Sequence, residues 1–515
     1  MYFGCIKAWP LIEVYGGNKS NKIEKNRKEI YILFFIVELK GILIYNQPMD
    51  KKHLFRRPGT IAMLILSLLG SLIILEFFAR FFYYQRHGKY SLALINAISY
   101  FIASDKKPDV EINEGRWRLV ENAKSRNKMT DEQKRQIQQL RSIGYLSGSL
   151  KAPWQKNVTI YNEKQAYNAY NLVVSGHKPE AILMDMTGCV IHKWGCDVFR
   201  AWPDFNPNEF MGKTNSANHS FWRRAHIMEN GDLLAIFEGI GVIKLDKNSN
   251  IIWKLFNGAH HDLYVGKNGN IYVLTREAHI NKKYNPDVPI LEDFISILEP
   301  NGTELEKISI LDLLLNSDFA PILRRGKLSG DIFHTNTIEL IEELPHGLNH
   351  PLTQGTVLIS VVQLDYIFAV DLVKKTVYWG ESDYWHYQHQ PTLLPNGNIL
   401  ILDNMGFEGR SSILEFDPGS RKIEWTYRGT KENPFYTGSC GACQRLQNGN
   451  TLITETDPGR AFEVTRGGKI VWEYINPYRA GKKSELIASL LEVVRLSPDF
   501  PVDWLPRNPV WQENQ

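Results

Sequence analysis

Short apolar runs alternate with polar turn residues in a pattern that repeats between about residues 158 and 478. The clearest copies begin at Leu393 and Gln444, and each holds three or four apolar stretches of strand length. Most copies carry an Asn-Gly pair after the first stretch, and tight type I′ hairpin turns prefer this pair because both central residues need positive φ. The pairs are Asn230-Gly231, Asn268-Gly269, Asn396-Gly397 and Asn448-Gly449.

A tryptophan closes the last apolar stretch of most copies. These positions are Trp194, Trp253, Trp379, Trp425 and Trp472, and one degenerate copy ends near Glu306. Six units with this spacing predict an all-β fold, a six-bladed β-propeller over residues 158–478. A parallel β-solenoid is the competing interpretation, but its coils are much shorter than these units.

A separate apolar stretch, Thr60–Ala79, is long enough for a membrane-spanning helix and is interrupted only by Glu76. Basic residues between 51 and 57 precede it, which predicts a cytoplasmic start and an exported remainder. No small-residue cleavage pattern follows, which favours an uncleaved anchor over a signal peptide. We therefore expect a single-pass transmembrane helix over residues 59–82, with the propeller in the periplasm or outside the cell.

The remaining segments are assigned around the anchor and the repeat. Residues 1–58 are expected to form a cytoplasmic leader, with Met49 as the suspected true initiator because a lysine-rich start and the anchor follow it. Residues 83–157 are predicted to be a charged spacer with a helix near 130–143. The apolar spacing of Ser484–Val494 predicts another short peripheral helix within residues 479–515, followed by an extended strap from Asp499.

Composition excludes some classes of partner and leaves the cysteine chemistry open. The 60 basic and 56 acidic residues nearly balance, so the chain lacks the electrostatic footprint of a nucleic-acid-binding protein. Cys189 with Cys196, and Cys440 with Cys443, could form disulfides in an oxidising compartment or remain as buried thiols. The second pair lies in a strand pattern, without the helix N-terminus that activates redox thiols, which favours a structural role.

Candidate chemistry follows from the repeat itself. The residues seven positions before the Asn of each turn are Arg223, His261, His389 and Gly441, and His334 matches them in the blade that lacks the turn. Innermost propeller strands line one channel, so residues at their starts should converge on one mouth. A single histidine at a strand start is usually a packed residue, but the chain has only 14 histidines and three share this position, which favours a functional cluster.

Such a cluster allows two kinds of chemistry. A neutral imidazole is a nucleophile near neutral pH, and a neighbouring histidine can act as acid and then as base. Arg223 and the amide of Asn336 could hold a developing oxyanion. Three imidazoles could instead bind Zn²⁺ with one open position. The spacing along the chain does not separate these interpretations.

Four segments resemble the bacterial arylsulfotransferase family: Ala259–Leu263, Phe333–Asn336, Gln388–Asn398 with Leu402–Asn404, and Arg445–Ile453. The resemblance implies a cofactor-independent transfer of a sulfuryl group from an aryl sulfate to a phenolic acceptor, through a sulfated histidine. It implies that His389 is the nucleophile and that His261 and His334 transfer protons and bind the oxyanion. We expect the substrate-binding residues to be Asn336, His260, Arg223, Asn404 and Arg410, with no metal and no cofactor.

One position departs from the family pattern. Val362 stands where the family usually carries an arginine, and Arg223, Arg224 or Arg410 are the candidates to replace that guanidinium. The alternatives to an arylsulfotransferase are a propeller that binds a glycan, an anionic ligand or an envelope protein without catalysis, and a metal-dependent hydrolase or lyase. The expected partners are the small-molecule donor and acceptor and the membrane, with a homo-oligomer as a further possibility.

Overall fold

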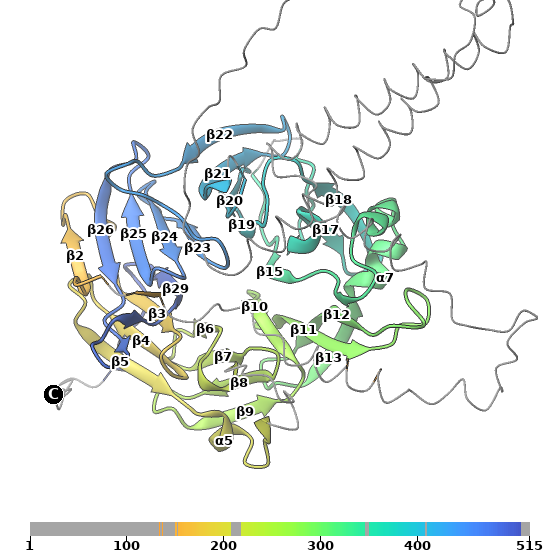
Figure 1. Cartoon of the computed structure of the whole chain (residues 1–515), viewed down its shortest axis with the longest axis horizontal. Coiled ribbons are helices and arrows are strands. Elements are labelled where there is room, and N and C mark those ends of the chain that lie inside the picture. The colour runs from red at the N-terminus through yellow and green to blue at the C-terminus, as the bar shows by residue number, and fades with distance from the viewer. Residues whose placement is uncertain are drawn as a thin grey trace, which may run out of the picture. The chain divides into compact units, whose positions relative to one another are not determined.

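Six antiparallel sheets surround a central axis in the computed structural model (Figure 1), which confirms the predicted all-β, six-bladed propeller. The structure describes residues 133, 136, 150–151, 153–207, 218–345, 350–406 and 409–505. The predicted leader and the transmembrane segment lie outside these residues. Among the helices that are described, none has the length and apolar character needed to span a bilayer.

Each of the first three blades is a sheet in which every strand is hydrogen-bonded to its neighbours. Blade 1 contains β29 (Leu490–Arg495), β3 (Asn171–Ser175), β4 (Glu180–Met184) and β5 (Val190–Gly195). Blade 2 contains β6 (Arg224–Ile227), β7 (Leu233–Phe237), β8 (Gly241–Leu245) and β9 (Ile251–Leu255). Blade 3 contains β10 (Ala259–Val265), β11 (Ile271–His279), β12 (Ile290–Leu298) and β13 (Glu304–Ser309), with β14 (Gly330–Asp331) parallel to β12.

The other three blades complete the ring. Blade 4 contains β15 (Thr335–Leu340), β16 (Val357–Val361), β17 (Tyr366–Asp371) and β18 (Thr376–Glu381). Blade 5 contains β19 (His389–Leu393), β20 (Ile399–Asp403), β21 (Ser412–Asp417) and β22 (Lys422–Tyr427). Blade 6 contains β23 (Ala442–Arg445), β24 (Thr451–Glu455), β25 (Arg460–Val464) and β26 (Ile470–Ile475), with β2 (Asn157–Tyr161) on its outer edge.

Short elements decorate the ring. A small sheet joins β1 (Leu150–Lys151), β28 (Leu486–Ile487) and β27 (Arg479–Ala480). The helices are α5 (Val198–Ala201), α7 (Ile310–Leu315) and the 3₁₀ turns η1 (Asn218–Ser220), η2 (Ala320–Arg325) and η3 (Val362–Leu364). In the predicted spacer helix, Gln133 and Gln136 are helical, and the Gln133 side chain donates a hydrogen bond to the carbonyl of Asp287 in blade 3.

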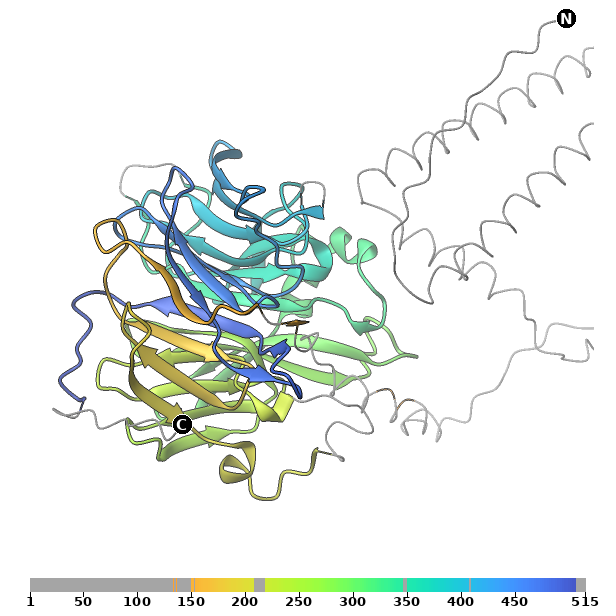
Figure 2. The ribbon, with the colours of Figure 1, turned by 60° about the vertical axis from the view of Figure 1, so that its left-hand side comes forward.

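The C-terminal part of the propeller corrects a prediction. The helix expected over Ser484–Val494 is absent, and β29 forms the innermost strand of blade 1, so the propeller extends beyond residue 478. Figures 1 and 2 show the dark blue β29 beside the yellow strands of that blade. The prediction of a helix was wrong because a short apolar run fits a buried strand and a helix equally well. The following strap is present through residue 505, and Trp504 packs on Trp194 at 5.6 Å between ring centroids.

The repeated tryptophans connect neighbouring blades. The indole nitrogens of Trp194, Trp253, Trp425 and Trp472 donate hydrogen bonds of 2.9–3.0 Å to backbone carbonyls in turns of the next blade. The last of these bonds joins blade 6 to blade 1, because the acceptor of Trp472 is Met186. Trp194 and Trp472 are fully buried and Trp253 and Trp425 half-buried, and each satisfies its N–H at the interface with the next blade.

The Asn-Gly hairpins are present, but their turn type differs from the prediction. Only the glycine of each pair has positive φ, between 82° and 87°, whereas a type I′ turn would need positive φ at both positions. The asparagine side chain instead accepts a bond from the backbone N–H two residues later, as Asn230 does from Asp232 at 3.0 Å. These are type I turns closed by a left-handed glycine, in which Asn stabilises the loop locally.

The four cysteines in the described residues are free thiols. Cys189 is exposed before β5 and Cys196 is buried after it, so a whole strand separates them and they cannot form a disulfide. Cys440 and Cys443 are both buried, and burial raises the pKa of the Cys443 thiol to about 12. The structure therefore agrees with buried thiols at the second pair and corrects the pairing of the first.

Candidate active site

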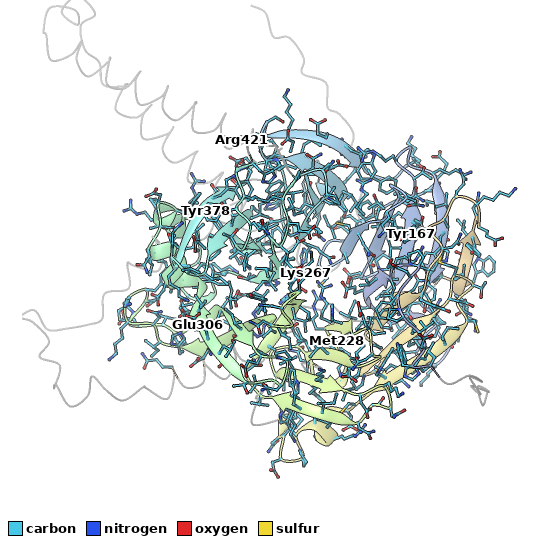
Figure 3. All side chains as sticks on the ribbon, turned by 180° about the vertical axis from the view of Figure 1, so that it is seen from behind. Tyr167, Met228, Lys267, Glu306, Tyr378 and Arg421 are labelled. Carbon is cyan, nitrogen blue, oxygen red and sulfur yellow. The ribbon has the colours of Figure 1, made fainter. Side chains whose placement is uncertain are left out.

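The innermost strands of blades 3 to 6 begin at the same end of the central channel and carry unusual backbone there. Positive φ values occur at His261 (51°), His334 (52°), Gln390 (47°) and Cys440 (54°). The register of β10 and of β19 also shifts at these points. Bulges of this kind redirect side chains, and left-handed non-glycine residues are strained, so both features are typical of functional sites. Figure 3 shows Lys267, in the turn after β10, near the middle of the ring, with Glu306 and Arg421 at its rim.

His389, the first residue of β19, has a defined tautomer. Its Nδ1 lies 2.8 Å from Oδ1 of Asn404 and 3.1 Å from the carbonyl oxygen of Tyr387. Both partners only accept, so Nδ1 carries the proton and Nε2 keeps its lone pair. Burial, followed by the charges of His334 and Arg223, lowers the pKa of His389 to about 3. The imidazole is therefore neutral near neutral pH, with its lone pair on Nε2.

The orientation of Asn404 is fixed by the neighbouring blade. Its Nδ2 donates two bonds of 2.7 Å, to the carbonyls of Thr437 and Cys440, so its oxygen faces His389. The side chain is fully buried. We predicted that Asn404 binds substrate, but its amide is occupied by the protein and orients the histidine.

Two more amides hold the strand that carries His389. Nε2 of Gln388 donates to the carbonyl of Tyr366 at 2.9 Å, which ties β19 to blade 4. Nδ2 of Asn336 donates to the carbonyl of Gln388 at 2.9 Å, and its oxygen accepts from the Thr337 hydroxyl at 3.0 Å. Asn336 therefore lies next to His389 and joins blades 4 and 5 at the site.

His260 and His261 form a buried imidazole pair in blade 3. Their Nδ1 atoms lie 2.8 Å apart, and the rings meet edge to face with centroids 5.1 Å apart. The backbone N–H of His261 donates to Glu238 at 3.2 Å. Burial lowers the pKa of both imidazoles well below the ordinary value, so both are neutral near neutral pH. His260, which we predicted to bind substrate, is 0% exposed.

His334 completes the group from blade 4. Its ring centroid lies 4.9 Å from that of His261, and its charge lowers the pKa of His389. Asp331 holds it through two bonds, one to the backbone N–H at 3.0 Å and one to Nδ1 at 2.9 Å. The structure thus brings together the three histidines that the sequence placed at equivalent strand starts.

The three candidate arginines differ in position. Arg223 is buried, with Nε 3.7 Å from Glu238, and its charge lowers the pKa of both His261 and His389. Arg224 pairs with Asp262 at 2.7 Å and with Glu492, on the wall of a cavity deeper in the channel.

The remaining positions are Arg410, the third candidate arginine, and Val362, which stands where the family usually carries an arginine. Arg410 is exposed in the loop between β20 and β21. Val362 is buried in η3, where its backbone N–H contacts the carbonyl of His334 at 3.4 Å. Of the three arginines, Arg223 is therefore the one that lies among the histidines.

Four charged residues of this cluster were missed from the sequence: Glu238, Arg276, Asp293 and Asp331. They lie in or after β7, β11, β12 and β14, whereas the repeated positions of the sequence lie at the starts of the innermost strands. Of these four, only Asp331 had a local signal in the sequence. It is an acidic residue three positions before His334, and it accepts hydrogen bonds from the backbone N–H and the ring of His334.

Several buried polar atoms at the site make no hydrogen bond within the described part of the chain. They are Nε of Arg223, Oε1 of Glu238, Nε2 of His260 and Oδ1 of Asp293. An unsatisfied buried polar group costs about 1–3 kcal/mol, so a group of them indicates a place that receives water or a polar ligand.

Glu238, His260 and His261 could in principle hold a metal ion, because their ligand atoms lie within 4.8 Å of one another. Two features of the surroundings disfavour a cation. The guanidinium groups of Arg223 and Arg276 lie 3.7 and 3.6 Å from the Glu238 carboxylate, and Nδ1 of His260 already contacts Nδ1 of His261. This environment suits an anion better than a divalent cation.

Deeper in the channel, the innermost strands line a cavity of about 190 Å³ with both polar and apolar side chains. Arg224, Asp262, Glu339 and Glu492 line it together with His226. Burial raises the pKa of Glu339 to about 8 and lowers that of His226 to about 4, so both groups are mainly neutral at pH 7. This cavity differs from the histidine cluster in its titratable groups, because Asp262, Glu339 and Glu492 contribute three carboxyl groups to its wall.

Comparison with solved structures returns proteins of low sequence identity. A protein of unknown function from Bacteroides caccae is 12% identical, with 60% of this chain and 94% of that chain covered and a TM-score of 0.40. The WD40 propeller domain of Doa1 (10% identity, 68% and 95% covered, TM-score 0.37) and streptogramin B lyase (13%, 68% and 99%, TM-score 0.36) are also similar. None of the curated proteins matches the chain.

The family comparison is more specific. The profile described as Arylsulfotransferase (ASST) matches residues 224–477, which begin at β6 and end just after β26. That range includes His261, His334 and His389 with the strands that carry them. Through residues 224–477 of its propeller, the chain belongs to the arylsulfotransferase family.

Proposed function

We propose that the protein transfers a sulfuryl group from an aryl sulfate to a phenolic acceptor through a sulfated His389. The observation that carries this proposal is the geometry of that residue: a neutral imidazole whose proton is held on Nδ1 by Asn404, which leaves the lone pair on Nε2. A nucleophile with a fixed tautomer and a low pKa is the main requirement of covalent catalysis by histidine.

The first half-reaction begins with attack of the Nε2 lone pair of His389 on sulfur. The bond between sulfur and the aryl oxygen breaks, and the leaving oxygen takes a proton from a neighbouring imidazole, for which His261 and His334 are the candidates. In the second half-reaction the oxygen of the phenolic acceptor attacks sulfur and gives its proton to that imidazole. The bond between sulfur and nitrogen breaks, and His389 is regenerated.

Arg223 is the proposed clamp for the sulfuryl oxygens, in place of the arginine that Val362 replaces. Its guanidinium is buried beside two of the histidines, and its Nε makes no hydrogen bond within the described residues. A charge-assisted donor in a buried site stabilises developing negative charge much more than it would in water. Asn336, which lies next to His389 on the side of blade 4, is proposed to help hold the developing oxyanion.

The experiment that tests this function is an assay of the protein with p-nitrophenyl sulfate and a phenol, which should release p-nitrophenol. His389→Ala should reduce the rate by at least about 10⁴-fold, as loss of a covalent nucleophile does. His350→Ala is the matched control, because His350 bonds the turn at the opposite end of β19 through the Gly397 carbonyl. Turnover that survives in His389→Ala would contradict the mechanism.

The competing function, ligand binding without catalysis, predicts a different result. In that case no aryl sulfate would be turned over by the intact site, while calorimetry would detect binding of an anionic ligand that Arg223→Gln weakens. We also propose that the propeller is exported and held at the membrane by the predicted anchor. Fractionation of the natural protein, with and without alkaline extraction of membranes, tests that placement.

A further inference from the structure

A line of three buried titratable groups runs from His261 through His260 to Asp293. Nδ1 of His261 lies 2.8 Å from Nδ1 of His260, and Nε2 of His260 lies 3.5 Å from Oδ1 of Asp293. All three side chains are at most 1% exposed. The second distance becomes a hydrogen bond after a movement of about half an ångström, and catalytic hydrogen bonds often tighten this way when substrate binds.

The contact between the two histidines permits only two arrangements of protons. Both rings are neutral because burial lowers the pKa of each, so one Nδ1 must donate and the other must accept. When Nδ1 of His260 donates, Nε2 of His260 can accept from Asp293, and the proton of His261 is on Nε2. In the reverse arrangement, Nε2 of His260 carries a proton and Nε2 of His261 is a base.

Asp293 is suited to hold a proton at neutral pH. Burial, followed by the charge of Asp331, raises its pKa to about 8, although a bond from the Thr335 N–H and the charge of Arg276 act in the opposite direction. Asp331 is close because β14 pairs with β12 in parallel, with Asp331 opposite Leu291. The charged or titratable groups around Asp293 are thus Asp331, His260 and Arg276.

We propose that Asp293 stores the proton of the transfer reaction and that His260 and His261 conduct it to and from the substrate oxygen. This inference rests on the proposed function, since it describes the proton path of the same site. Asp293 acts through His260, so it is a positioning residue and a proton store, whereas His261 is the group that would touch the substrate.

The protons balance over the two half-reactions. In the first, Nε2 of His261 gives its proton to the leaving oxygen, the proton on Nδ1 of His260 moves to Nδ1 of His261, and the Asp293 proton moves to Nε2 of His260. Asp293 is then a carboxylate, and Nε2 of His261 is a base. In the second, the acceptor phenol gives its proton to that base, and the same three transfers run backwards.

This arrangement points to donors that leave poorly without protonation. An ordinary phenol has a pKa of about 10, so its phenolate needs a proton when the bond to sulfur breaks. A nitrophenolate is much more stable and leaves without help. The relay therefore implies that the substrates are sulfate esters of unactivated phenols, and it predicts that its loss affects these esters selectively.

The experiment compares phenyl sulfate with p-nitrophenyl sulfate in Asp293→Asn, with the same phenolic acceptor. The turnover of phenyl sulfate should fall by about 10²-fold or more, the usual contribution of general acid catalysis, while that of p-nitrophenyl sulfate falls by less than about tenfold. Asp312→Asn is the matched control, because Asp312 is exposed on α7. An equal loss for both esters would overturn the relay, since a merely structural defect has no reason to depend on the leaving group.

A second variant and a measurement on the unchanged protein guard against misfolding. His260→Gln interrupts the same path one residue earlier and should give the same dependence on the leaving group. If both variants fail to fold, the relay is tested on the wild-type protein, by its rate with phenyl sulfate in mixtures of light and heavy water. A curved dependence on the deuterium fraction supports several protons in motion, and a linear one overturns the relay. A wild-type protein that turns over neither ester would instead overturn the proposed function itself, and the relay with it.

Discussion

The two sides of the histidine cluster hold their imidazoles in different ways. On the side of blade 5, His389 is held by an amide and a backbone carbonyl, and both are neutral. On the side of blades 3 and 4, His260 faces Asp293 and His334 is bonded to Asp331, so each imidazole has a carboxyl group behind it. Neutral acceptors fix a tautomer and favour the charged ring less than burial disfavours it, so His389 stays neutral, whereas carboxyl partners supply and accept protons. The contrast suits chemically identical side chains to the different roles that we propose, nucleophile on one side and acid or base on the other.

Removal of the neutral partner should have the largest effect after loss of the nucleophile itself. We expect Asn404→Ala to lower turnover by about 10²-fold or more, because His389 loses the bond that fixes its tautomer and position. The carbonyls of Thr437 and Cys440 also lose their donor, which should cost about 1–3 kcal/mol of stability. Steady-state kinetics and thermal unfolding measure the two effects. Asn398→Ala is the control in the same blade. An unchanged rate in Asn404→Ala would contradict the role of the neutral amide partner of His389.

The anion clamp gives a second test, on the boundary between the two sides. Arg223→Gln should lower the rate with any aryl sulfate by about 10²-fold, since a buried donor to the transferring group is lost. The loss should be similar for phenyl and p-nitrophenyl sulfate, in contrast to the relay variants. Arg410→Gln should have little effect, because that side chain is exposed in a loop. A large loss in Arg410→Gln with none in Arg223→Gln would assign the clamp to the loop.

The pH dependence should separate the two sides. A lowered pKa keeps His389 neutral down to about pH 3, so protonation of the nucleophile should not limit the rate above that pH. A raised pKa keeps the proton on Asp293 up to about pH 8, so turnover of phenyl sulfate should fall about tenfold per pH unit above that point. Rates with p-nitrophenyl sulfate should lack this alkaline limb. The same limb for both esters would contradict the assignment to the proton store.

Glu339 provides a smaller, matched test, because it is a carboxyl group with a similarly raised pKa outside the line of imidazoles. Its folded-state pKa of about 8 exceeds the ordinary 4.5, so its contribution to stability is complete below about pH 4.5 and is lost as the pH rises to 8. Over that window the free energy of unfolding should fall by roughly 1 kcal/mol per pH unit, and Glu339→Gln should remove this slope. Denaturant titrations at several pH values measure it, and the alkaline limb of phenyl sulfate turnover should stay in place.

The sequence predicted the features that repeat and missed those that do not. The Asn-Gly pairs and tryptophans recur because most blades share the same hairpin and four of them share the same bond to the next blade, so they identified the propeller and aligned His261, His334 and His389. The closing strand β29 has no counterpart in the pattern, because it is a short buried run that joins blade 1 from the far end of the chain. A strand and a helix bury such a run equally well, and only its pairing partners distinguish them.

The charged groups behind the histidines could not be predicted for a similar reason. Glu238, Arg276 and Asp293 lie on second and third strands or at their ends, and each contacts the cluster across a blade or between blades. Such contacts depend on the register and spacing of strands, and the sequence carries no local signal of them. Asn404 was found, but its role differed from our prediction, because its two bonds to blade 6 are visible only in three dimensions.

Mass spectrometry of the protein after brief treatment with p-nitrophenyl sulfate, in the absence of an acceptor, would detect the covalent intermediate itself. We expect one added sulfuryl group per chain, on the peptide that contains His389, and its loss when a phenol is added. An adduct on a different histidine, or an unmodified His389 during active turnover, would contradict the account.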